Sequence, residues 1–183
     1  DMGVTEFAFY DDALLVDQES HIIPILNGIV KSKLPVHFHT PNGLHPRLID
    51  SELAKLMVTS GFHTVRLSYE TCNPDRQKKM GMKVTDADLK RAVRFLKKAG
   101  LPSESIGSYV LMGLPDQPLS EVMESMSVVW DLGIRVSLAS FSPIPGTRSW
   151  DEAVESGLLP RDADPLLTNN SVFPLRSENI TFL

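Results

Sequence analysis

Cysteine is nearly absent from this sequence, which has Cys72 alone among its 183 residues. A single cysteine excludes an intramolecular disulfide framework and is typical of a protein in a reducing compartment. A catalytic cysteine needs a neighbouring base, and the sequence places none beside Cys72. We therefore expect Cys72 to be a plain loop thiol.

Long apolar runs and an excess of positive charge are also missing. No stretch approaches the roughly 18 consecutive apolar residues of a membrane span. Residues 1–20 include several acidic side chains where a signal peptide is cationic and then apolar. The net charge of -5 provides no basic surface for nucleic acid or an acidic membrane. These absences predict a cytoplasmic protein with no nucleic-acid or membrane partner.

Strand-like and helix-like segments alternate along the chain. The apolar spacing predicts helices at about 18–32, 48–60, 85–99, 119–132 and 148–157, and strands at 4–10, 36–40, 64–71, 106–112 and 134–141. Repeated strand–helix units of this kind form parallel sheets with right-handed crossovers.

The number of strands limits the fold. A complete eight-stranded barrel needs about 250 residues, so about five strands predict an α/β fold with a partial parallel (β/α) barrel over residues 1–157. An irregular tail, residues 158–183, is expected to pack on the barrel. A flat, flavodoxin-like sheet is the alternative architecture.

The stretch 64–71 has the clearest polar face. Arg66, Ser68 and Glu70 share one face of the predicted strand, and the residues between them are apolar. A strand inside an α/β protein can present such a face to a ligand-lined barrel lumen. The pattern therefore favours a barrel over a flavodoxin-like sheet, with a site near Glu70 at the C-terminal end of the strand.

Polar or turn-forming residues follow every predicted strand. They are Asp11-Asp12, residues 40–43, residues 70–72, residues 113–117 and residues 142–147. Ligands of parallel α/β folds bind at this edge of the sheet. Turns require many of the same residue types, so a plain loop is the alternative for each segment taken alone.

His37 and His39 lie two residues apart on a predicted strand, so they share one face. Such a pair can bind a metal, as in metal-dependent hydrolase barrels. No histidine follows His63, however, so the later strands provide no further imidazole ligands. Packed or hydrogen-bonded histidines are the simpler interpretation. A metal-dependent hydrolase-like barrel and a non-catalytic ligand-binding or interaction module stay open as alternative functions.

The order of these segments resembles the radical S-adenosylmethionine (SAM) superfamily, and most closely its members with a cobalamin-binding domain upstream. The resemblance spans about residues 4–150. It rests on residues 9–15 (FYDDALL), 39–44 (HTPNGL), 66–70 (RLSYE), 109–115 (YVLMGLP) and 142–147 (SPIPGT). Each motif is short, but their order and spacing together are specific.

The resemblance implies a partial (β/α)₆ barrel that holds SAM across the C-terminal ends of its strands. Asp11 and Asp12 fall where a family motif holds the amino end of the SAM methionine moiety. Ser68 and Glu70 match the motif that contacts the ribose or the methionine moiety. We expect Arg66 to hold the charge of Glu70 or to meet the SAM carboxylate.

Two later segments complete the implied site. Residues 106–113 match the strand beside the adenine, which assigns Tyr109, Met112 and Gly113 to SAM binding. Ser142 begins the loop that would close the far side of SAM.

The substrate is unknown, because members of this superfamily bind it with variable residues of the barrel lumen. In this chain we expect His37, His39 and Asn42 to contact it.

The loop that defines the family is missing. Its Cys-x3-Cys-x2-Cys pattern holds a [4Fe-4S] cluster that binds and reductively cleaves SAM, whereas this chain has one cysteine, elsewhere. The resemblance implies that this loop precedes Asp1 in a longer parent enzyme, which uses SAM, the cluster and, in an upstream domain, cobalamin. A natural cluster-free relative is the alternative. We expect the chain alone to be inactive and to bind SAM weakly at most.

A missing first strand would leave the edge of the strand at residues 4–10 unpaired. Unpaired apolar edges seek partners, so we predict a homodimer through this edge.

Overall fold

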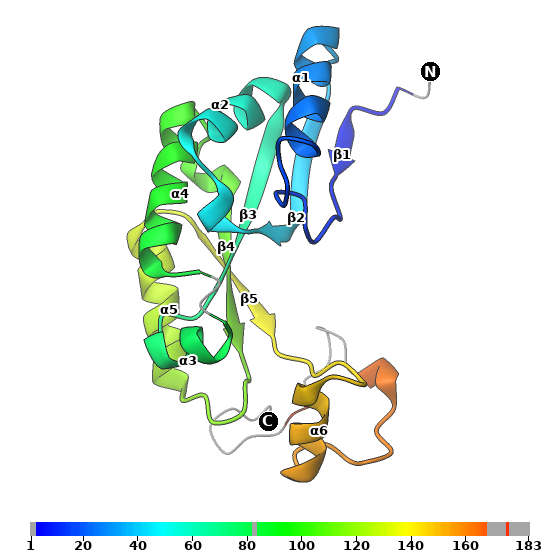
Figure 1. Cartoon of the computed structure of the whole chain (residues 1–183). Helices are drawn as coiled ribbons and strands as arrows, with labels where there is room; N and C mark the ends of the chain where they lie inside the picture. The colour runs from blue at the N-terminus through cyan, green and yellow to red at the C-terminus, as the bar shows by residue number, and fades with distance from the viewer. Residues whose placement is uncertain (1–2, 82–83, 168–174, 176–183) are drawn as a thin grey trace.

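Five parallel strands form one open sheet in the order β1-β2-β3-β4-β5 (Figure 1). The computed structural model describes residues 3–81, 84–167 and 175. The strands are β1 (Glu6–Ala8), β2 (His37–Leu44), β3 (Phe62–Glu70), β4 (Ile106–Met112) and β5 (Arg135–Ser140). Each pairs in parallel with the next. This sequential order confirms the partial barrel and excludes the flavodoxin-like alternative, whose strand order reverses within the sheet.

Helices connect the strands on one face of the sheet, and a further helix follows the last strand. They are α1 (Ile22–Ser32), α2 (Ser51–Ser60), α3 (Pro74–Lys79), α4 (Asp86–Ala99), α5 (Leu119–Asp131) and α6 (Arg148–Glu155), with 3-10 turns at Pro46–Leu48, Ser103–Ser105 and Pro165–Leu167. One hydrophobic core joins α1, α2, α4 and α5 to the inward side chains of the strands. We call the opposite side of the sheet the open face.

Helix α4 illustrates how local sequence positions these elements. Thr85 and Asp88 form a reciprocal capping box at its start, which satisfies backbone donors that have no partner inside the helix. Leu89 and Leu96 are completely buried at helical spacing against the sheet. Each such side chain contributes about 2 kcal/mol through burial, so the apolar stripe fixes the face that α4 turns inward.

Strands β1 and β2 differ from the sequence expectation. β1 is a three-residue edge strand with exposed side chains rather than a strand over 4–10. β2 continues through Pro41, Asn42 and Gly43, which we expected to form a turn. The reason is tertiary: the ladder shifts register between Thr40 and Leu44, so the strand bulges and continues instead of ending.

Two helices also depart from the expectation. α1 begins at Ile22 instead of residue 18, because turns occupy the preceding residues and Asp17 has a φ of 50°. The short helix α3 was not expected. Asn73 caps it by accepting from the backbone N–H groups of Asp75 and Arg76, and Pro74 occupies its first turn, where proline fits well.

A second, smaller cluster lies after β5. Ala153 of α6 packs with Leu159 and Leu175, so the described part of the tail lies against α6. The remainder of the predicted tail, 168–174 and 176–183, lies outside the described residues. The division of the chain at residue 157 stays a prediction.

Across the part of the chain that the structure describes, no helix combines the length and apolar character needed to cross a bilayer. β1 lies at the edge of the sheet, as expected, but it is only three residues long. Homodimerisation through this edge stays a prediction.

Candidate functional site

Strand β3 has an apolar face and a polar face, as its sequence predicts. Val65, Leu67 and Tyr69 are buried beneath the helices, with exposed fractions of 0%, 0% and 2%. The alternate residues Arg66, Ser68 and Glu70 are half-buried. They therefore lie on the open face, which no helix of the described residues covers.

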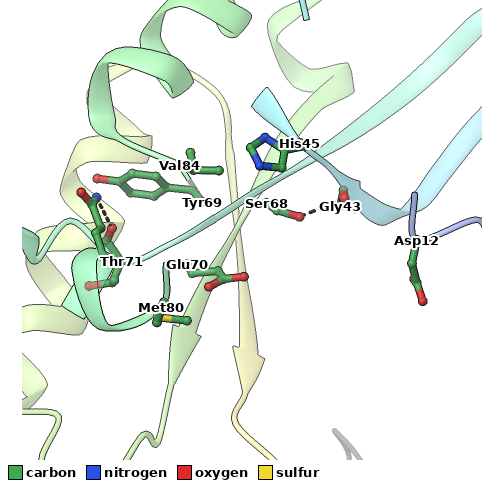
Figure 2. Close-up of a pocket in the computed structure, with 10 residues that line it drawn as sticks. Asp12, Gly43, His45, Ser68, Tyr69, Glu70, Thr71, Met80 and Val84 are labelled. Atoms are coloured by element: carbon green, nitrogen blue, oxygen red, sulfur yellow. Dashed lines mark hydrogen bonds between the residues drawn. The ribbon is translucent and has the colours of Figure 1, made fainter. Parts of the chain in front are cut away.

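The C-terminal ends of β2 and β3 border a cavity of about 190 Å³ (Figure 2). It adjoins a second one of about 470 Å³, which shares Asp12, Gly43 and Ser68 with it. We call the combined space, bordered by Asp12, Asn42, Gly43, Ser68 and Glu70, the upper hollow. Its outer wall is completed by the side chains of His45, Thr71, Gln77, Met80 and Val84.

Asp12 lies in the upper hollow, whereas Asp11 does not border it. The Asn42 amide donates to Asp12 Oδ1 at 2.6 Å and to the Tyr10 carbonyl at 2.9 Å. Asp11 instead accepts from the Ala13 N–H at 2.7 Å and lies 3.7 Å from His21. The two adjacent carboxylates therefore have different surroundings, and β2 orients only Asp12.

Gly43 allows β2 and β3 to approach closely at the upper hollow. The Ser68 hydroxyl donates to the Gly43 carbonyl at 2.9 Å. A Cβ at Gly43 would lie 2.2 Å from Ser68 Oγ and 3.1 Å from the Ser68 nitrogen, which is closer than atoms pack in proteins. Glycine is required here because of this contact, not because of a turn. The Ser68 oxygen keeps lone pairs with which to accept from a ligand.

Glu70 ends β3 in a strained backbone conformation. Its φ is 77°, and the ladder with β4 shifts register between Ser68 and Glu70. A non-glycine residue in this region costs about 1–3 kcal/mol and is often found at functional sites. Figure 2 shows Glu70 and Asp12 on opposite sides of the hollow. The site thus presents two carboxylates to one space.

A buried polar cluster supports the loop after Glu70; we call it the Glu121 network. Glu121 of α5 is only 4% exposed and accepts from Arg76 Nε at 2.7 Å and from the Thr71 hydroxyl at 2.7 Å. It also accepts from Asn73 at 3.2 Å and Gln117 at 3.4 Å. Burial alone raises the pKa of Glu121, but the bonds from Arg76 and Thr71 outweigh it and hold that pKa below its usual value. The network fixes the wall of the upper hollow to α5.

A second space, the lower hollow, lies closer to the N-terminal ends of the strands. Its volume is about 380 Å³, and its lining includes Tyr10, His39, Thr64, Arg66 and Tyr109. The Tyr109 hydroxyl donates to the Pro41 carbonyl at 2.6 Å, and both residues border the upper and the lower space. Arg66 therefore lies below this bridge and not among the residues lining the cavity beside Glu70.

His37 and His39 are hydrogen-bonded strand histidines. They bond to the two oxygens of Glu6 at 2.7 and 2.8 Å, and His39 also bonds to the Thr64 hydroxyl at 2.8 Å. The bonds from His39 and His37 lower the pKa of Glu6. Within the described residues, no group of three or more His, Cys, Asp or Glu side chains could hold a metal ion. The described part of the chain thus offers no ligand set for the hydrolase alternative.

Three other expected site residues lie at or after the ends of β4 and β5. Gly113 directly follows β4, and Ser142 follows β5. The partly buried Met112 side chain packs against the main hydrophobic core. Its carbonyl accepts from the Phe141 N–H at 2.8 Å.

Cys72 also packs against the core, and its N–H donates to the Ser125 hydroxyl at 3.0 Å. Burial raises the pKa of its thiol. This placement agrees with a plain loop thiol.

Sequence reasoning missed the wall formed by Gln77, Met80 and Val84 and the network beneath it. The Asn73-Pro74 pair is a helix-start signal, and it could have indicated α3 and so the position of Gln77. Glu121 gave no such signal, because its partner Thr71 is 50 residues away in the sequence.

Known proteins are similar to this chain in sequence or in fold. An uncharacterized methyltransferase of Pyrococcus horikoshii is 28% identical over 158 residues, which cover 86% of this chain and 33% of that protein. The radical SAM methyltransferase TsrM of Kitasatospora setae, solved with cobalamin and a [4Fe-4S] cluster, has a TM-score of 0.69 and 20% identity over 88% of this chain and 32% of its own.

Escherichia coli coproporphyrinogen III oxidase (HemN), a radical SAM enzyme, has a TM-score of 0.59 and 14% identity, covering 81% of this chain and 34% of its own. The chain thus spans about a third of the length of each relative, and the two solved structures show the fold alone. The sequence profile of the Radical SAM superfamily matches residues 3–129. This match covers more than half of the chain, which therefore belongs to the radical SAM superfamily, whose members use SAM and a [4Fe-4S] cluster.

Proposed function

We propose that this chain is the SAM-binding part of a radical SAM methyltransferase, and that SAM occupies the upper hollow. The observation that supports this most directly is the pair of carboxylates, Asp12 and Glu70, that face one cavity at the C-terminal strand edge. The methyltransferase relatives support the reaction class.

The residues of the upper hollow fit the chemistry of SAM. SAM has an ammonium group, a sulfonium and a ribose diol, and all three favour nearby negative charge or strong acceptors. Asp12, held by Asn42, is placed to receive the ammonium group. Glu70 can accept from the paired ribose hydroxyls, and Met80 and Val84 provide an apolar wall. When bound beside a reduced cluster, SAM supplies the radical or the methyl group.

The residues present do not fit the [4Fe-4S] cluster. A cluster of this kind needs several thiolates, and the sequence offers Cys72 alone, whose half-buried thiol has a raised pKa. We propose that the cluster ligands, and a domain for cobalamin, which TsrM binds, belong to other parts of a longer protein. The chain by itself is then inactive. A cytoplasmic location is part of the same proposal and rests on the low cysteine content.

SAM binding to the 183-residue chain tests the site. We expect weak, saturable NMR shifts centred on Gly43, Ser68 and Glu70. Glu70→Gln removes a charged acceptor, and such hydrogen bonds contribute about 1.5–3 kcal/mol, so the dissociation constant should rise about tenfold or more.

Glu104→Gln is the matched control, because Glu104 is exposed and lies before β4, outside the lining of the upper hollow. It should bind SAM like the unaltered chain. A well-folded chain without any SAM binding would instead favour a non-catalytic module. If Glu70→Gln binds SAM as tightly as the unaltered chain, Glu70 is not part of the site.

A further inference from the structure

We propose that Arg66 and Arg135, which flank Gly107 on the open face, bind a carboxylate or phosphate group of a ligand other than SAM. The inference deepens the proposed function, on which its biological meaning rests, because it gives the substrate an anionic group. It assigns the two arginines a role apart from the upper hollow.

The sheet register places the two arginines together. Arg66 pairs with Gly107 on β4, and Gly107 pairs with Arg135 on β5. Residues paired across a parallel ladder point to the same face, and the neighbouring Val136 packs on the core side. Adjacent strands lie about 4.8 Å apart, so the two arginine Cα atoms are separated by roughly 10 Å. Two guanidinium groups can converge on one anion across this distance.

Gly107 provides the space in which the Arg66 side chain lies. A Cβ at Gly107 would be 3.0 Å from Arg66 Cδ and 3.2 Å from both Nε and Nη1. The Arg66 side chain therefore leans over β4, toward Arg135. The lack of a side chain at Gly107 keeps the strip between the two arginines open.

Neither arginine has a carboxylate partner. Arg66 has one long side-chain hydrogen bond, from Nη1 to the Val65 carbonyl at 3.4 Å. Among the described residues no acidic side chain pairs with Arg66 or Arg135, whereas Arg76 bonds to Glu121 at 2.7 Å. A guanidinium has five N–H donors, and a half-buried one without a counter-charge is costly. An anionic ligand would satisfy these donors.

The surroundings of Arg66 are suited to an anion and not to the cationic groups of SAM. Glu6 of β1 is engaged by His37 and His39. The Tyr109–Pro41 bridge lies between Arg66 and the carboxylates of the upper hollow. Arg66 lines the lower hollow, whose volume of about 380 Å³ is of the size that accommodates small ligands. Arg135 is exposed on β5 outside this lining, so it would reach the anion across Gly107.

Titration of the 183-residue chain with inorganic phosphate, and separately with acetate, tests the proposal. The readout is the Nε–Hε NMR signal of each arginine at constant ionic strength, with chloride as the reference anion. We expect saturable shifts of the Arg66 and Arg135 signals. Arg66→Gln and Arg135→Gln should each weaken binding at least fivefold, because each removes a charge-assisted pair.

Arg94→Gln is the control for the loss of one positive charge, because Arg94 is exposed on α4. It should leave phosphate affinity unchanged. Arg66→Lys should restore binding only in part, since lysine lacks the bidentate fork of arginine. Shifts that never saturate would overturn the proposal. So would a phosphate affinity in both glutamine variants equal to that of the unaltered chain.

A competition experiment separates this site from the SAM site. Phosphate and SAM should bind together, each with an affinity independent of the other, and SAM should bind normally to Arg66→Gln. Displacement of phosphate by SAM would instead assign the arginines to the SAM carboxylate and overturn the claim of a second ligand. Phosphate binding without any SAM binding would contradict the proposed function but leave the anion site intact. SAM binding without phosphate binding would contradict the anion site but leave the proposed function intact.

Discussion

The upper and lower hollows occupy the same face of the same sheet but have opposite charge. Asp12 and Glu70 give the upper hollow two carboxylates, whereas Arg66 gives the lower one a guanidinium. Arg66 and Glu70 are four residues apart on β3, a rise of roughly 13 Å. One strand can therefore present two chemically distinct binding regions when a cross-strand bridge, here Tyr109 to Pro41, separates them.

The two hollows are also supported by different kinds of interaction. A buried network on the helix side supports the upper one, and Glu121 is its centre. Exposed hydrogen bonds to Glu6 hold the strands near the lower one. We therefore expect substitutions under the upper hollow to affect folding strongly, and those around the lower hollow to affect mainly binding.

The largest effect should come from Glu121→Ala. The change leaves Arg76, whose side chain is 17% exposed, without its partner, and breaking a buried ion pair in this way costs about 3–5 kcal/mol. Urea unfolding should show this loss, and SAM affinity should fall as well because Thr71 loses its anchor. Glu124→Ala, an exposed position on the same helix, should have little effect. Similar stabilities for the two variants would contradict a supporting role for the network.

The same network predicts a pH dependence. The pKa of Glu121 is lowered from its ordinary value of 4.5 in the folded state. Its contribution to stability is therefore complete above the unfolded pKa and is lost as pH falls through the lower, folded pKa. Unfolding measured from pH 6 downward should show the unaltered chain losing more stability below about pH 4.5 than Glu121→Gln does. Parallel pH profiles would show that Glu121 is not ionised in the fold.

Gly43→Ala should have the next largest effect. The added Cβ would lie 2.2 Å from Ser68 Oγ, and such overpacking costs about 1–3 kcal/mol. Ser68→Ala in the same chain should recover part of this loss, while the contact with the Ser68 nitrogen at 3.1 Å remains. Gly28→Ala is the control, because a Cβ added at Gly28 would meet no heavy atom within 4 Å beyond its chain neighbours and the adjacent backbone of α1; it should stabilise α1 by about 0.5–1 kcal/mol. Thermal unfolding distinguishes these outcomes.

The segment around Gly43 marks a limit of what the sequence could predict. Strand faces such as Val65 against Arg66 follow from alternation, and helices such as α4 from apolar spacing and caps, because both signals are local. The Pro41–Gly43 segment contains turn residues, yet it remains in β2 because Ser68 and Tyr109 bond to its carbonyls. Neither contact leaves a trace in the local sequence.

The candidate site shows the same contrast between local signals, which the sequence reveals, and long-range contacts, which it does not. Alternation and the position of Glu70 at a strand end correctly placed Ser68 and Glu70 on the open face. The sequence could not separate Asp11 from Asp12, because only the contact with Asn42, 30 residues away, distinguishes them. It also could not show the Tyr109–Pro41 bridge between Arg66 and Glu70, because this bridge links residues 68 apart.

Gly107→Ala should have a small effect on stability and a selective one on binding. The contact it creates is with the Arg66 side chain at 3.0 Å, and a flexible side chain can move away, so we expect a loss of about 1 kcal/mol or less. Phosphate affinity should nevertheless fall, because Arg66 is displaced from the strip beside Arg135, whereas SAM affinity should not. A parallel decrease in both affinities would mean that the two hollows form a single site.

The smallest effect should come from Glu6→Gln. Glu6 is exposed, and an exposed pair contributes little to global stability, so the unfolding midpoint should change only slightly. Its local effect is different, because Glu6 is the shared partner of His37 and His39 across the three-residue pairing of β1 with β2. The N–H of His37, which donates to the Thr5 carbonyl at 2.7 Å, should exchange faster with solvent deuterium. Exchange at Val110, in the buried strand β4, should stay as in the unaltered chain, and acceleration at both positions would show that β1 is part of one cooperative unit with the core.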